Sequence, residues 1–182
     1  MKQNHIIALI VGESGSGKTT ICDELSKRYG LKQVESYTTR PRRDGETCGH
    51  IFISENEMPD KSEMCAYTLY NGNHYFATHQ QIDDADLYVI DPAGVEYFKK
   101  HYRGRKIPKV VYLYAPVVER LKRMAARGDT EQNVIRRHEL DKRAFANVQS
   151  DVQIENADLD ECVAELYYYL CEQEGKLIGE DI

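Results

Sequence analysis

The chain carries a complete G-x-x-x-x-G-K-[ST] pattern near its start, Gly12-Glu13-Ser14-Gly15-Ser16-Gly17-Lys18-Thr19. An apolar run over residues 6–11 precedes the pattern, and apolar residues at helical spacing follow it. A buried strand that leads through a glycine-rich loop into a helix points backbone N–H groups and the positive end of the helix dipole at phosphate oxygens. The pattern therefore predicts a strand–loop–helix unit that binds a nucleoside triphosphate.

The residue types in the loop each have a chemical role in this prediction. Glycine lets the backbone turn tightly and approach a ligand without a Cβ in the way. Lys18 can reach the β- and γ-phosphates, and the hydroxyl of Thr19 can bind Mg²⁺, so Thr19 is the candidate metal ligand. We expect the triphosphate of ATP to contact the whole loop and the residue after it: Gly12, Glu13, Ser14, Gly15, Ser16, Gly17, Lys18, Thr19 and Thr20.

Length and composition limit the remaining possibilities. A chain of 182 residues with 41% hydrophobic and 30% charged residues is typical of a single soluble globular domain. Its longest apolar run is far shorter than the ~20 residues that span a bilayer, and it has no secretory signal pattern. Five scattered cysteines without a C-x-x-C pair fit free thiols in a reducing compartment. We therefore expect a cytoplasmic monomer or homodimer that does not interact with a membrane.

The net charge of −6 argues against a nucleic-acid partner, because proteins that bind nucleic acids present a broad basic surface. A small anionic nucleotide needs only local positive charge. Two groups of arginines can supply it: Arg40, Arg42 and Arg43 in one, and Arg120, Arg123, Arg127, Arg136 and Arg137 in the other.

Strand and helix patterns alternate along most of the chain. Apolar runs predict strands at 6–11, 87–90, 109–114 and 152–154. Helical spacing and capping residues predict helices that end at Gly30, begin after Asp91 and Pro116, occupy about 131–147, and start at an Asp158-x-x-Glu161 cap. In the helix after Pro116 we expect four side chains to face inward: Val117, Leu121, Met124 and Ala125. This alternation predicts an α/β fold with a P-loop NTPase-type parallel sheet flanked by helices.

Residues 33–78 break this alternation. They show no helical pattern but contain short β-prone runs, including 67–70 and 74–76, with Asn71-Gly72 between these two. Asn-Gly between β-prone runs is typical of a hairpin turn. We predict one domain with a core of residues 1–32, 79–127 and 148–182, a small β-rich insertion at about 33–78, and a mobile helical lid at about 128–147.

A second motif follows the first predicted helix: Ser36-Tyr37-Thr38-Thr39-Arg40-Pro41-Arg42-Arg43, then Gly45-Glu46 and Gly49. Together with the phosphate-binding loop, this motif strongly resembles the guanylate kinase family, and the resemblance extends over residues 5–172. It implies that the insertion binds a nucleoside monophosphate and that Ser36, Arg40 and Arg43 hold its phosphate. Guanidinium groups suit this task because each can bind a phosphate through two parallel hydrogen bonds.

The resemblance implies two further residues for the acceptor nucleotide. The stretch Gly72-Asn73-His74-Tyr75 is similar to the family's hairpin, whose tyrosine, here Tyr75, helps to hold the acceptor phosphate. Asp91 matches an acid that faces the nucleotide base. An Asp before Pro92 is also a normal helix N-cap, worth about 1 kcal/mol, and both roles stay open for Asp91.

The resemblance also covers the lid and the adenine side of the site. Arg127 and Arg137 match the lid arginines that fold over the transferring phosphoryl group. Arg123 and Arg136 are interpreted as arginines on solvated helix faces. Asn156 falls in the family's segment beside the adenine of ATP.

Two departures from the family pattern concern base recognition. The family's guanine-reading glutamate falls at Ala66, with Glu63 as the nearest acid, and the small hydroxyl residue near guanine O6 falls at Ala77, next to Thr78. A site that loses the groups that pair with a polar edge also loses its discrimination. Either Glu63 and Thr78 take over base recognition, or the acceptor is not GMP.

Two more departures concern phosphate and metal. A tyrosine that would contact the acceptor phosphate is Phe52, which lacks the hydroxyl. An acid near the metal is Val89, so Mg²⁺ is expected to depend on Thr19 and water.

The resemblance implies an ATP-dependent nucleoside monophosphate kinase with Mg²⁺ as cofactor, most directly guanylate kinase acting on GMP and dGMP. Phosphoryl transfer needs alignment and positive charge more than covalent chemistry, so Lys18, Arg127 and Arg137 are the candidate catalytic residues. Two alternatives stay open: a related kinase for another nucleotide or a ribose phosphate, and a non-catalytic guanylate kinase-like binding module. Such modules typically have a degraded phosphate-binding loop, whereas Gly17-Lys18-Thr19 is intact here.

Overall fold

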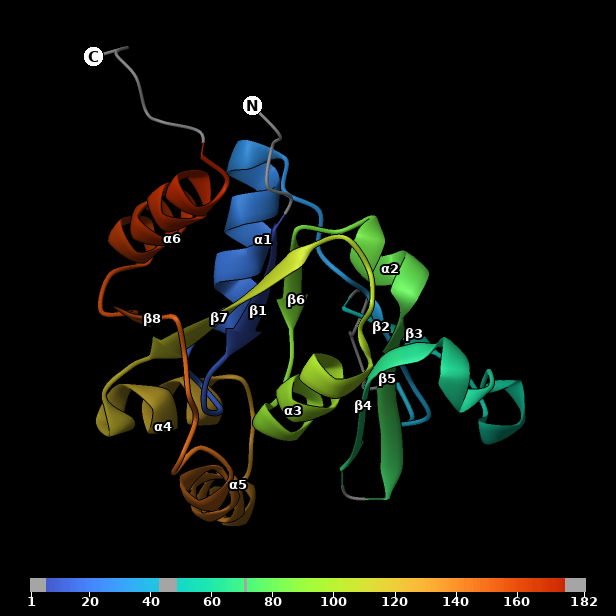
Figure 1. Ribbon diagram of the computed structural model, residues 1–182. Coiled ribbons are helices and arrows are strands. Elements are labelled where there is room, and N and C mark those ends of the chain that lie inside the picture. Colours follow the sequence, from blue (N-terminus) through green and yellow to red (C-terminus); the bar gives the residue numbers. More distant parts are fainter. Residues whose placement is uncertain (1–5, 43–48, 71, 176–182) are drawn as a thin grey trace.

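The computed structural model describes residues 6–42, 49–70 and 72–175. Within these residues the strands form two four-stranded sheets, one with the order β6-β1-β7-β8 and one with the order β3-β2-β5-β4 (Figure 1). The first sheet is parallel throughout, and the second is mixed. The α/β fold with a parallel sheet is therefore confirmed.

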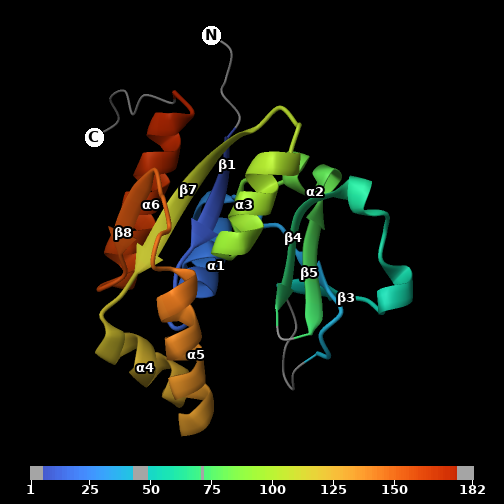
Figure 2. The same ribbon diagram turned by 60° about the horizontal axis from the view of Figure 1, so that its bottom comes forward.

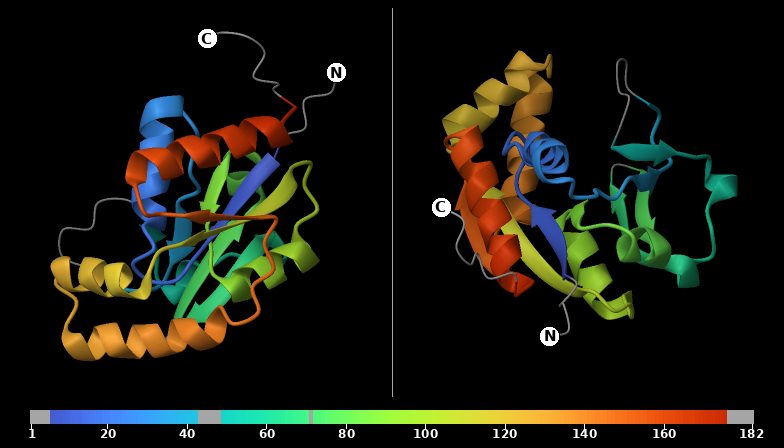
Figure 3. Two further views of the ribbon diagram at one scale, coloured as in Figure 1. Left: turned by 90° about the vertical axis from the view of Figure 1, so that its left-hand side faces the viewer. Right: turned by 90° about the horizontal axis from the view of Figure 1, so that it is seen from above.

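The parallel sheet and its helices follow the predicted alternation. The strands are β1 (Ile6–Val11), β6 (Leu87–Val89), β7 (Ile107–Tyr114) and β8 (Val152–Glu155). The helices that cover the sheet are α1 (Lys18–Tyr29), α3 (Pro92–His101) and α6 (Leu159–Gln173). Helices α1 and α6 lie together on one face of the sheet, and α3 covers the other face (Figure 3).

Local chemistry explains where these helices begin and end. Helix α1 ends at Gly30, whose φ of 70° is a conformation that a residue without a Cβ adopts at no steric cost. The carboxylates of Asp91 and Asp158 accept backbone N–H groups in the first turns of α3 and α6. These three boundaries agree with the sequence-based prediction.

Strand β1 is the centre of the core. It pairs with β6 on one side and β7 on the other, and all six of its residues are at most 4% exposed. Its side chains alternate between two hydrophobic clusters, one against α3 and one against α1 and α6. Full burial of an aliphatic side chain contributes about 1.5–3 kcal/mol, so the strand that leads into the phosphate-binding loop is strongly anchored.

The insertion forms the mixed sheet. Its strands are β2 (Ser36–Thr38), β3 (His50–Phe52), β4 (Met64–Tyr70) and β5 (Asn73–Thr78). The predicted hairpin is confirmed, because β4 and β5 pair antiparallel up to Tyr70 and Asn73. Asn71 itself lies outside the described residues. The 3-10 turns at Glu55–Glu57 and Lys61–Glu63 and the short helix α2 (His79–Asp83) were not predicted.

Helices α4 (Val117–Ala126) and α5 (Glu131–Ala144) pack against each other. They stand on one side of the parallel sheet, and the mixed sheet stands on the other (Figures 1 and 2). The loop between β1 and α1 lies at the end of the parallel sheet that α4 and α5 approach. The bounds of core, insertion and lid stay a prediction.

The inward face of α4 was predicted wrongly in part. Met124 is buried as expected, but the other buried residue is Arg120, whereas Val117 and Ala125 are exposed and Leu121 is only half-buried. The physical reason is a carboxylate on the neighbouring loop that pairs with the buried guanidinium, which hydrophobic periodicity cannot reveal. Among the described residues, none of the helices has the length and apolar character needed to cross a membrane.

Candidate active site

The loop between β1 and α1 has the geometry of an anion-binding turn. Gly15 and Gly17 have φ values of 78° and 94°, which side chains with a Cβ rarely adopt. Gly17 is the N-cap of α1, and no side chain caps this helix end. The first N–H groups of α1 and the positive end of its dipole are therefore available to an anion.

Lys18 folds back over this loop. Its Nζ donates to the carbonyl oxygens of Gly12, at 2.6 Å, and Glu13, at 3.1 Å. Burial lowers the pKa of Lys18 to about 8, while the negative charge of Asp141 acts in the opposite direction. The ammonium group thus lies at the loop, in an environment where an incoming anion would stabilise its charge.

A buried ion pair supports the loop from below. The guanidinium Nη1 of Arg120 lies 2.9 Å from Oε2 of Glu13, and the whole residue is 1% exposed. Among the described residues, Nε and Nη1 of Arg120 have no hydrogen-bond partner, so the contact is an ion pair without a well-directed hydrogen bond. The sequence-based grouping placed Arg120 with the phosphate-binding arginines, but the structure places it underneath the loop as a support.

Asn156 holds the other end of the loop. Its Nδ2 donates to the carbonyl oxygen of Ser16 at 2.8 Å, and the residue is 4% exposed. Nη2 of Arg123 donates in turn to the carbonyl oxygen of Asn156 at 3.1 Å. Arg123 therefore does not point into solvent as interpreted from the sequence, and both residues fix the loop backbone. The predicted contact of Asn156 with adenine stays a prediction.

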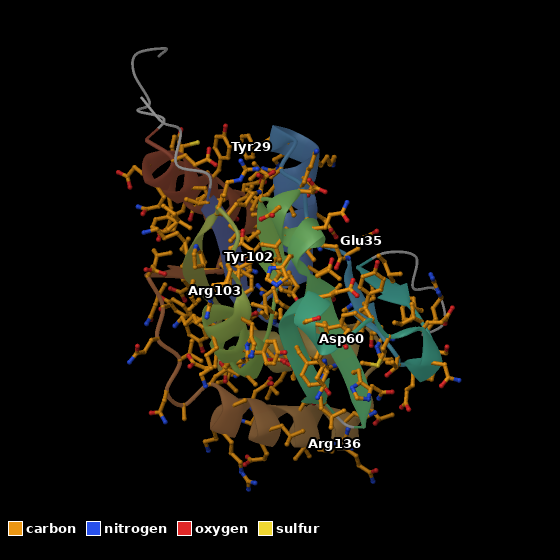
Figure 4. The ribbon with its side chains drawn as sticks, turned by 45° about the vertical axis from the view of Figure 1, so that its right-hand side comes forward. Tyr29, Glu35, Asp60, Tyr102, Arg103 and Arg136 are labelled. Atoms are coloured by element: carbon orange, nitrogen blue, oxygen red, sulfur yellow. The ribbon has the colours of Figure 1, made fainter. Side chains whose placement is uncertain are left out.

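Arg127 and Arg137, the two arginines predicted for the lid, meet at one carboxylate that the sequence did not single out. Nε of Arg127 lies 2.7 Å from one oxygen of Asp129, and Nη1 of Arg137 lies 3.5 Å from the other. The positive charges of both guanidinium groups add to burial, the main cause, in lowering the pKa of Lys18. Arg136 lies exposed on the surface of α5, at the edge of the molecule (Figure 4).

Asp141 of α5 contacts the phosphate-binding loop directly. Its Oδ2 accepts a hydrogen bond from the backbone N–H of Ser14 at 2.6 Å, across 127 residues of sequence. Ionised carboxylates form short, strong bonds of this kind with backbone N–H groups. The Asp141 carboxylate therefore occupies one backbone N–H group of the predicted triphosphate site. Sequence inspection offered no signal for Asp141, because it is one of several charged residues on a polar helix.

The insertion presents side chains that are predicted to bind the acceptor phosphate on one face of the mixed sheet. Register places Ser36 opposite His50, and Thr38 opposite Tyr75. The hydroxyl of Ser36 lies 2.9 Å from Nδ1 of His50, and the rings of His50 and Tyr75 are 5.7 Å apart. Ser36 and Tyr75 are thus brought together, with His50 between them.

Arginine side chains border this group. The guanidinium groups of Arg40 and Arg42 lie over the ring of Phe52, at 5.2 Å and 4.4 Å from its centroid. His50 also contacts Phe52, edge to face. Of the two arginines predicted to bind the acceptor phosphate, Arg40 and Arg43, Arg43 lies outside the described residues.

Asp91 follows β6 of the parallel sheet and contacts Thr68 in β4 of the mixed sheet. Its Oδ1 accepts the N–H of Gly94 at 2.7 Å and the hydroxyl of Thr68 at 3.0 Å. The N-cap role is therefore confirmed. The role toward a nucleotide base stays a prediction, and Oδ2 has no partner among the described residues.

Comparison with known proteins identifies the family. The family model described as guanylate kinase matches residues 3–173. The chain is 32% identical over 150 residues to the guanylate kinase of Geobacter metallireducens. The matched segment covers 75% of this chain and 72% of that protein. The chain belongs to the guanylate kinase family.

Further relatives agree with this assignment. The chain is 32% identical over 182 residues to the guanylate kinase of Syntrophotalea carbinolica, covering 91% of this chain and 84% of that protein. The crystal structure of guanylate kinase from Anaplasma phagocytophilum matches with a TM-score of 0.69 and 20% identity, over 98% of this chain and 93% of that chain. At that identity the structural match supports the fold alone.

The two positions at which the resemblance predicts base recognition, Ala66 and Ala77, carry apolar side chains. Ala66 and Ala77 are paired across β4 and β5, are 1% and 0% exposed, and belong to the hydrophobic core cluster. Neither side chain offers a hydrogen-bonding group. The expected substitutes lie elsewhere, so the structure does not bring Glu63 and Thr78 together with Ser36 and Tyr75.

Thr78 and Glu63 border a hollow on the opposite face of the mixed sheet, together with Tyr37 and His79. Thr78 follows Ala77 in β5, so its side chain points to the other face, where its hydroxyl accepts the N–H of Gln81 and caps α2. Glu63 ends a 3-10 turn just before β4. Successive side chains of a strand point to opposite faces of the sheet, so only a residue two positions from Ala77 would share its face. Thr78 is one position from Ala77 and therefore points to the opposite face.

The metal-binding candidates are few. Thr19 and Thr20 are exposed in the first turn of α1, and Val89 packs against the hydrophobic core. The described residues contain no group of three or more His, Cys, Asp or Glu side chains that could hold a metal ion. Because Mg²⁺ in nucleotide sites usually binds one or two protein ligands, water and substrate phosphates, the Thr19 hydroxyl beside an anion-binding loop fits it.

Proposed function

We propose that this chain is an ATP-dependent guanylate kinase that transfers the γ-phosphoryl group of ATP to GMP or dGMP, producing ADP and GDP or dGDP. The observation that carries the proposal is the phosphate-binding loop with Lys18 folded over it, in front of a helix N-terminus that no side chain caps. Membership in the guanylate kinase family supports the choice of substrates. Free thiols at Cys22, Cys65, Cys162 and Cys171 support work in the reducing cytoplasm, and the oligomeric state we propose is a monomer or homodimer.

On the donor side, the loop and the first turn of α1, residues 12–20, hold the triphosphate of ATP through backbone N–H groups. Lys18 moves from its carbonyl partners to the phosphate oxygens, where its charge is stabilised. Thr19 and water would hold Mg²⁺, which would supply positive charge to the phosphate oxygens of ATP. Asn156 keeps the loop in shape through Ser16 and lies on the adenine side.

On the acceptor side, Ser36, Arg40, Arg43 and Tyr75 hold the phosphate of the monophosphate, which is itself the nucleophile. Asp91 offers its Oδ2 to an N–H group of the base. Glu63 and Thr78 remain candidates only if the insertion rearranges when it binds the base. No general base is required, because the attacking phosphate is already ionised at neutral pH.

The lid completes the site. Closure of α5 brings Arg127 and Arg137 to the three equatorial oxygens of the transferring group, where negative charge is concentrated in the transition state. Closure also excludes water that would otherwise hydrolyse ATP. Asp129, which already joins both arginines, keeps them oriented.

A panel assay tests the proposal. ADP formation from Mg·ATP is measured with GMP, dGMP, AMP, CMP, UMP and ribose 5-phosphate as acceptors. Turnover with GMP and dGMP is the expected result. Binding of ATP without turnover of any acceptor would instead identify a non-catalytic binding module.

A second candidate, a kinase of the same type with a different acceptor, is favoured by one observation. The positions that read guanine in the family are the buried alanines Ala66 and Ala77. The same panel decides between the two: turnover confined to another monophosphate or to ribose 5-phosphate would keep the kinase and discard guanine as the base.

A further inference from the structure

The side chain of Thr68 in β4 reaches from the mixed sheet to the first turn of α3. Its hydroxyl donates to Oδ1 of Asp91 at 3.0 Å, and the same oxygen accepts the N–H of Gly94 at 2.7 Å. Thr68 lies opposite Tyr75 in the β4–β5 ladder, so the two side chains share a face of the sheet. No sequence motif singled out Thr68, yet it joins the predicted acceptor site to the end of a strand of the parallel sheet.

Close packing keeps the Thr68 hydroxyl at this place. Helix α3 packs against β4, and both Thr68 and Asp91 are half-buried. A Cβ added at Gly94 would lie 3.2 Å from Oγ1 of Thr68 and 2.7 Å from Cγ1 of Ile90. The hydroxyl therefore sits in a space that is open only because position 94 has no side chain.

We propose that Thr68 is a positioning residue for recognition of the acceptor base, and that it holds the Asp91 carboxylate with Oδ2 toward that base. This inference rests on the proposed function, in which Asp91 accepts an N–H group of the base. The terminal torsion of an Asp side chain has a broad range, so one hydrogen bond alone leaves the carboxylate plane poorly fixed. Two donors on Oδ1 fix that plane, and Oδ2, which has no partner among the described residues, is left to accept from a ligand.

The neighbouring positions make this carboxylate important for the choice of base. Ala66 lies two residues before Thr68 on the same face and pairs with Ala77, and neither buried alanine has a group that could pair with a base. Base recognition therefore depends on Asp91. An ionised carboxylate only accepts hydrogen bonds, so it favours the N–H groups on the pairing edge of guanine over the unprotonated ring nitrogen of adenine.

The test uses the full chain and two substitutions at one position. Thr68→Val keeps the shape and removes the hydroxyl, whereas Thr68→Ser keeps the hydroxyl. Calorimetry gives the Kd for GMP, AMP and ATP, and steady-state kinetics give kcat and KM. Because a hydrogen bond to a charged group is lost, the preference for GMP over AMP, taken as the ratio of the two Kd values, should fall about threefold to tenfold in Thr68→Val. Thr68→Ser should keep that ratio within about twofold of the wild type.

A positioning role and a merely structural role give different results. In Thr68→Val the KM for GMP should rise, while kcat at saturating GMP and the Kd for ATP change less than about twofold, because the bond orients a group that recognises the base. An unchanged ratio in Thr68→Val, or an equal loss in Thr68→Ser, would overturn the proposal. Equal losses of affinity for all three nucleotides together with a lower Tm would also overturn it.

Ser62 offers a matched control. Its hydroxyl donates at 2.8 Å to Asp60, the carboxylate that caps the 3-10 turn Lys61–Glu63. The bond has the same chemistry as the one between Thr68 and Asp91, but Ser62 borders the hollow on the opposite face of the mixed sheet. Ser62→Ala should leave the ratio within about twofold, and a loss equal to that in Thr68→Val would overturn the assignment.

A double variant shows whether Thr68 acts through Asp91. Asp91→Asn keeps a side chain that caps α3 but presents an NH₂ group in place of the second oxygen, so the preference for GMP should fall. Adding Thr68→Val to Asp91→Asn should then lower the ratio no further. Full additivity of the two substitutions would overturn the proposal.

Failure of the proposed function is distinguishable from failure of this inference, because the Kd ratio does not require phosphoryl transfer. GMP binding that depends on Thr68 in a chain without kinase activity would refute the kinase and keep the positioning role. Where the wild type prefers another nucleoside monophosphate, the ratio is taken with that nucleotide over ribose 5-phosphate, which has no base, and its fall in Thr68→Val supports the inference. Wild-type preference for ribose 5-phosphate itself, or no binding of any monophosphate, would refute both.

Discussion

The donor and acceptor sides of the molecule differ in how closely their parts are tied together. The phosphate-binding loop is fixed by residues from three distant elements, Arg120 of α4, Asp141 of α5 and Asn156 after β8. On the insertion, by contrast, the two positions predicted to recognise the base, Ala66 and Ala77, are apolar and buried. The residues that fix the phosphate-binding loop therefore belong to other elements than the positions predicted to recognise the base.

The largest effect is expected on the donor side. Lys18→Ala removes the one ammonium group held at the loop and should reduce kcat for every acceptor by about 10⁴-fold, as loss of a phosphate-stabilising charge does. Lys27→Ala on the exposed side of α1 is the control and should leave kcat within about twofold. Comparable mild losses in both variants would contradict the role of Lys18.

Two neighbouring arginines test the lid. Arg137→Ala should lower kcat by about 10³-fold with little change in the Kd for ATP, because its charge acts mainly on the transferring group. Arg136→Ala, one residue away on the exposed face of α5, should lower kcat by less than about twofold. Stopped-flow single-turnover rates for the two variants measure the difference, and equal rates would remove Arg137 from the site.

The support beneath the loop is expected to matter for stability first. Arg120→Met leaves the Glu13 carboxylate without its buried partner and should lower the free energy of unfolding by about 3 kcal/mol. Adding Glu13→Gln removes the orphaned charge and should recover part of that loss. Urea denaturation of the single and double variants gives both numbers, and a double variant less stable than Arg120→Met would speak against the ion pair as the cause.

A smaller effect is expected where α5 competes with the nucleotide. Asp141→Asn removes the carboxylate that accepts the Ser14 N–H, so ATP should bind about threefold to tenfold more tightly. Glu139→Gln, exposed on the same helix, should leave the Kd unchanged. Calorimetric titration with ATP checks both, and weaker binding in Asp141→Asn would mean that Asp141 helps to hold the nucleotide instead.

The smallest effect concerns the face of the mixed sheet that lies opposite Ser36 and Tyr75. Glu63→Ala should change the ratio of kcat/KM for GMP and AMP by less than about twofold, because Glu63 lies with Thr78 on the face away from Ser36 and Tyr75. Asp91→Asn, on the inner side, is the comparison and should lower that ratio. A clear fall in GMP preference in Glu63→Ala would return Glu63 to the base site.

Much of this architecture was predictable because its determinants are local. The phosphate-binding loop, the strand before it, the Gly30 helix end, the Asp91 and Asp158 caps and the β4–β5 hairpin all depend on neighbouring residues. The motif around Ser36 and Arg40 likewise pointed to the family before any contact was known. For such features, spacing and turn chemistry along the chain are sufficient.

The tertiary structure alone decided which polar side chains meet. Arg120 is buried because Glu13 reaches it from another element, and Asp141 contacts Ser14 across 127 residues. Thr78 is excluded from the inner face by a one-residue shift in a strand of period two. Contacts of this kind depend on how elements pack in three dimensions. The sequence by itself determined the phosphate-binding unit and the alternating fold, and packing decided what supports that unit, what competes with its ligand and what faces the acceptor.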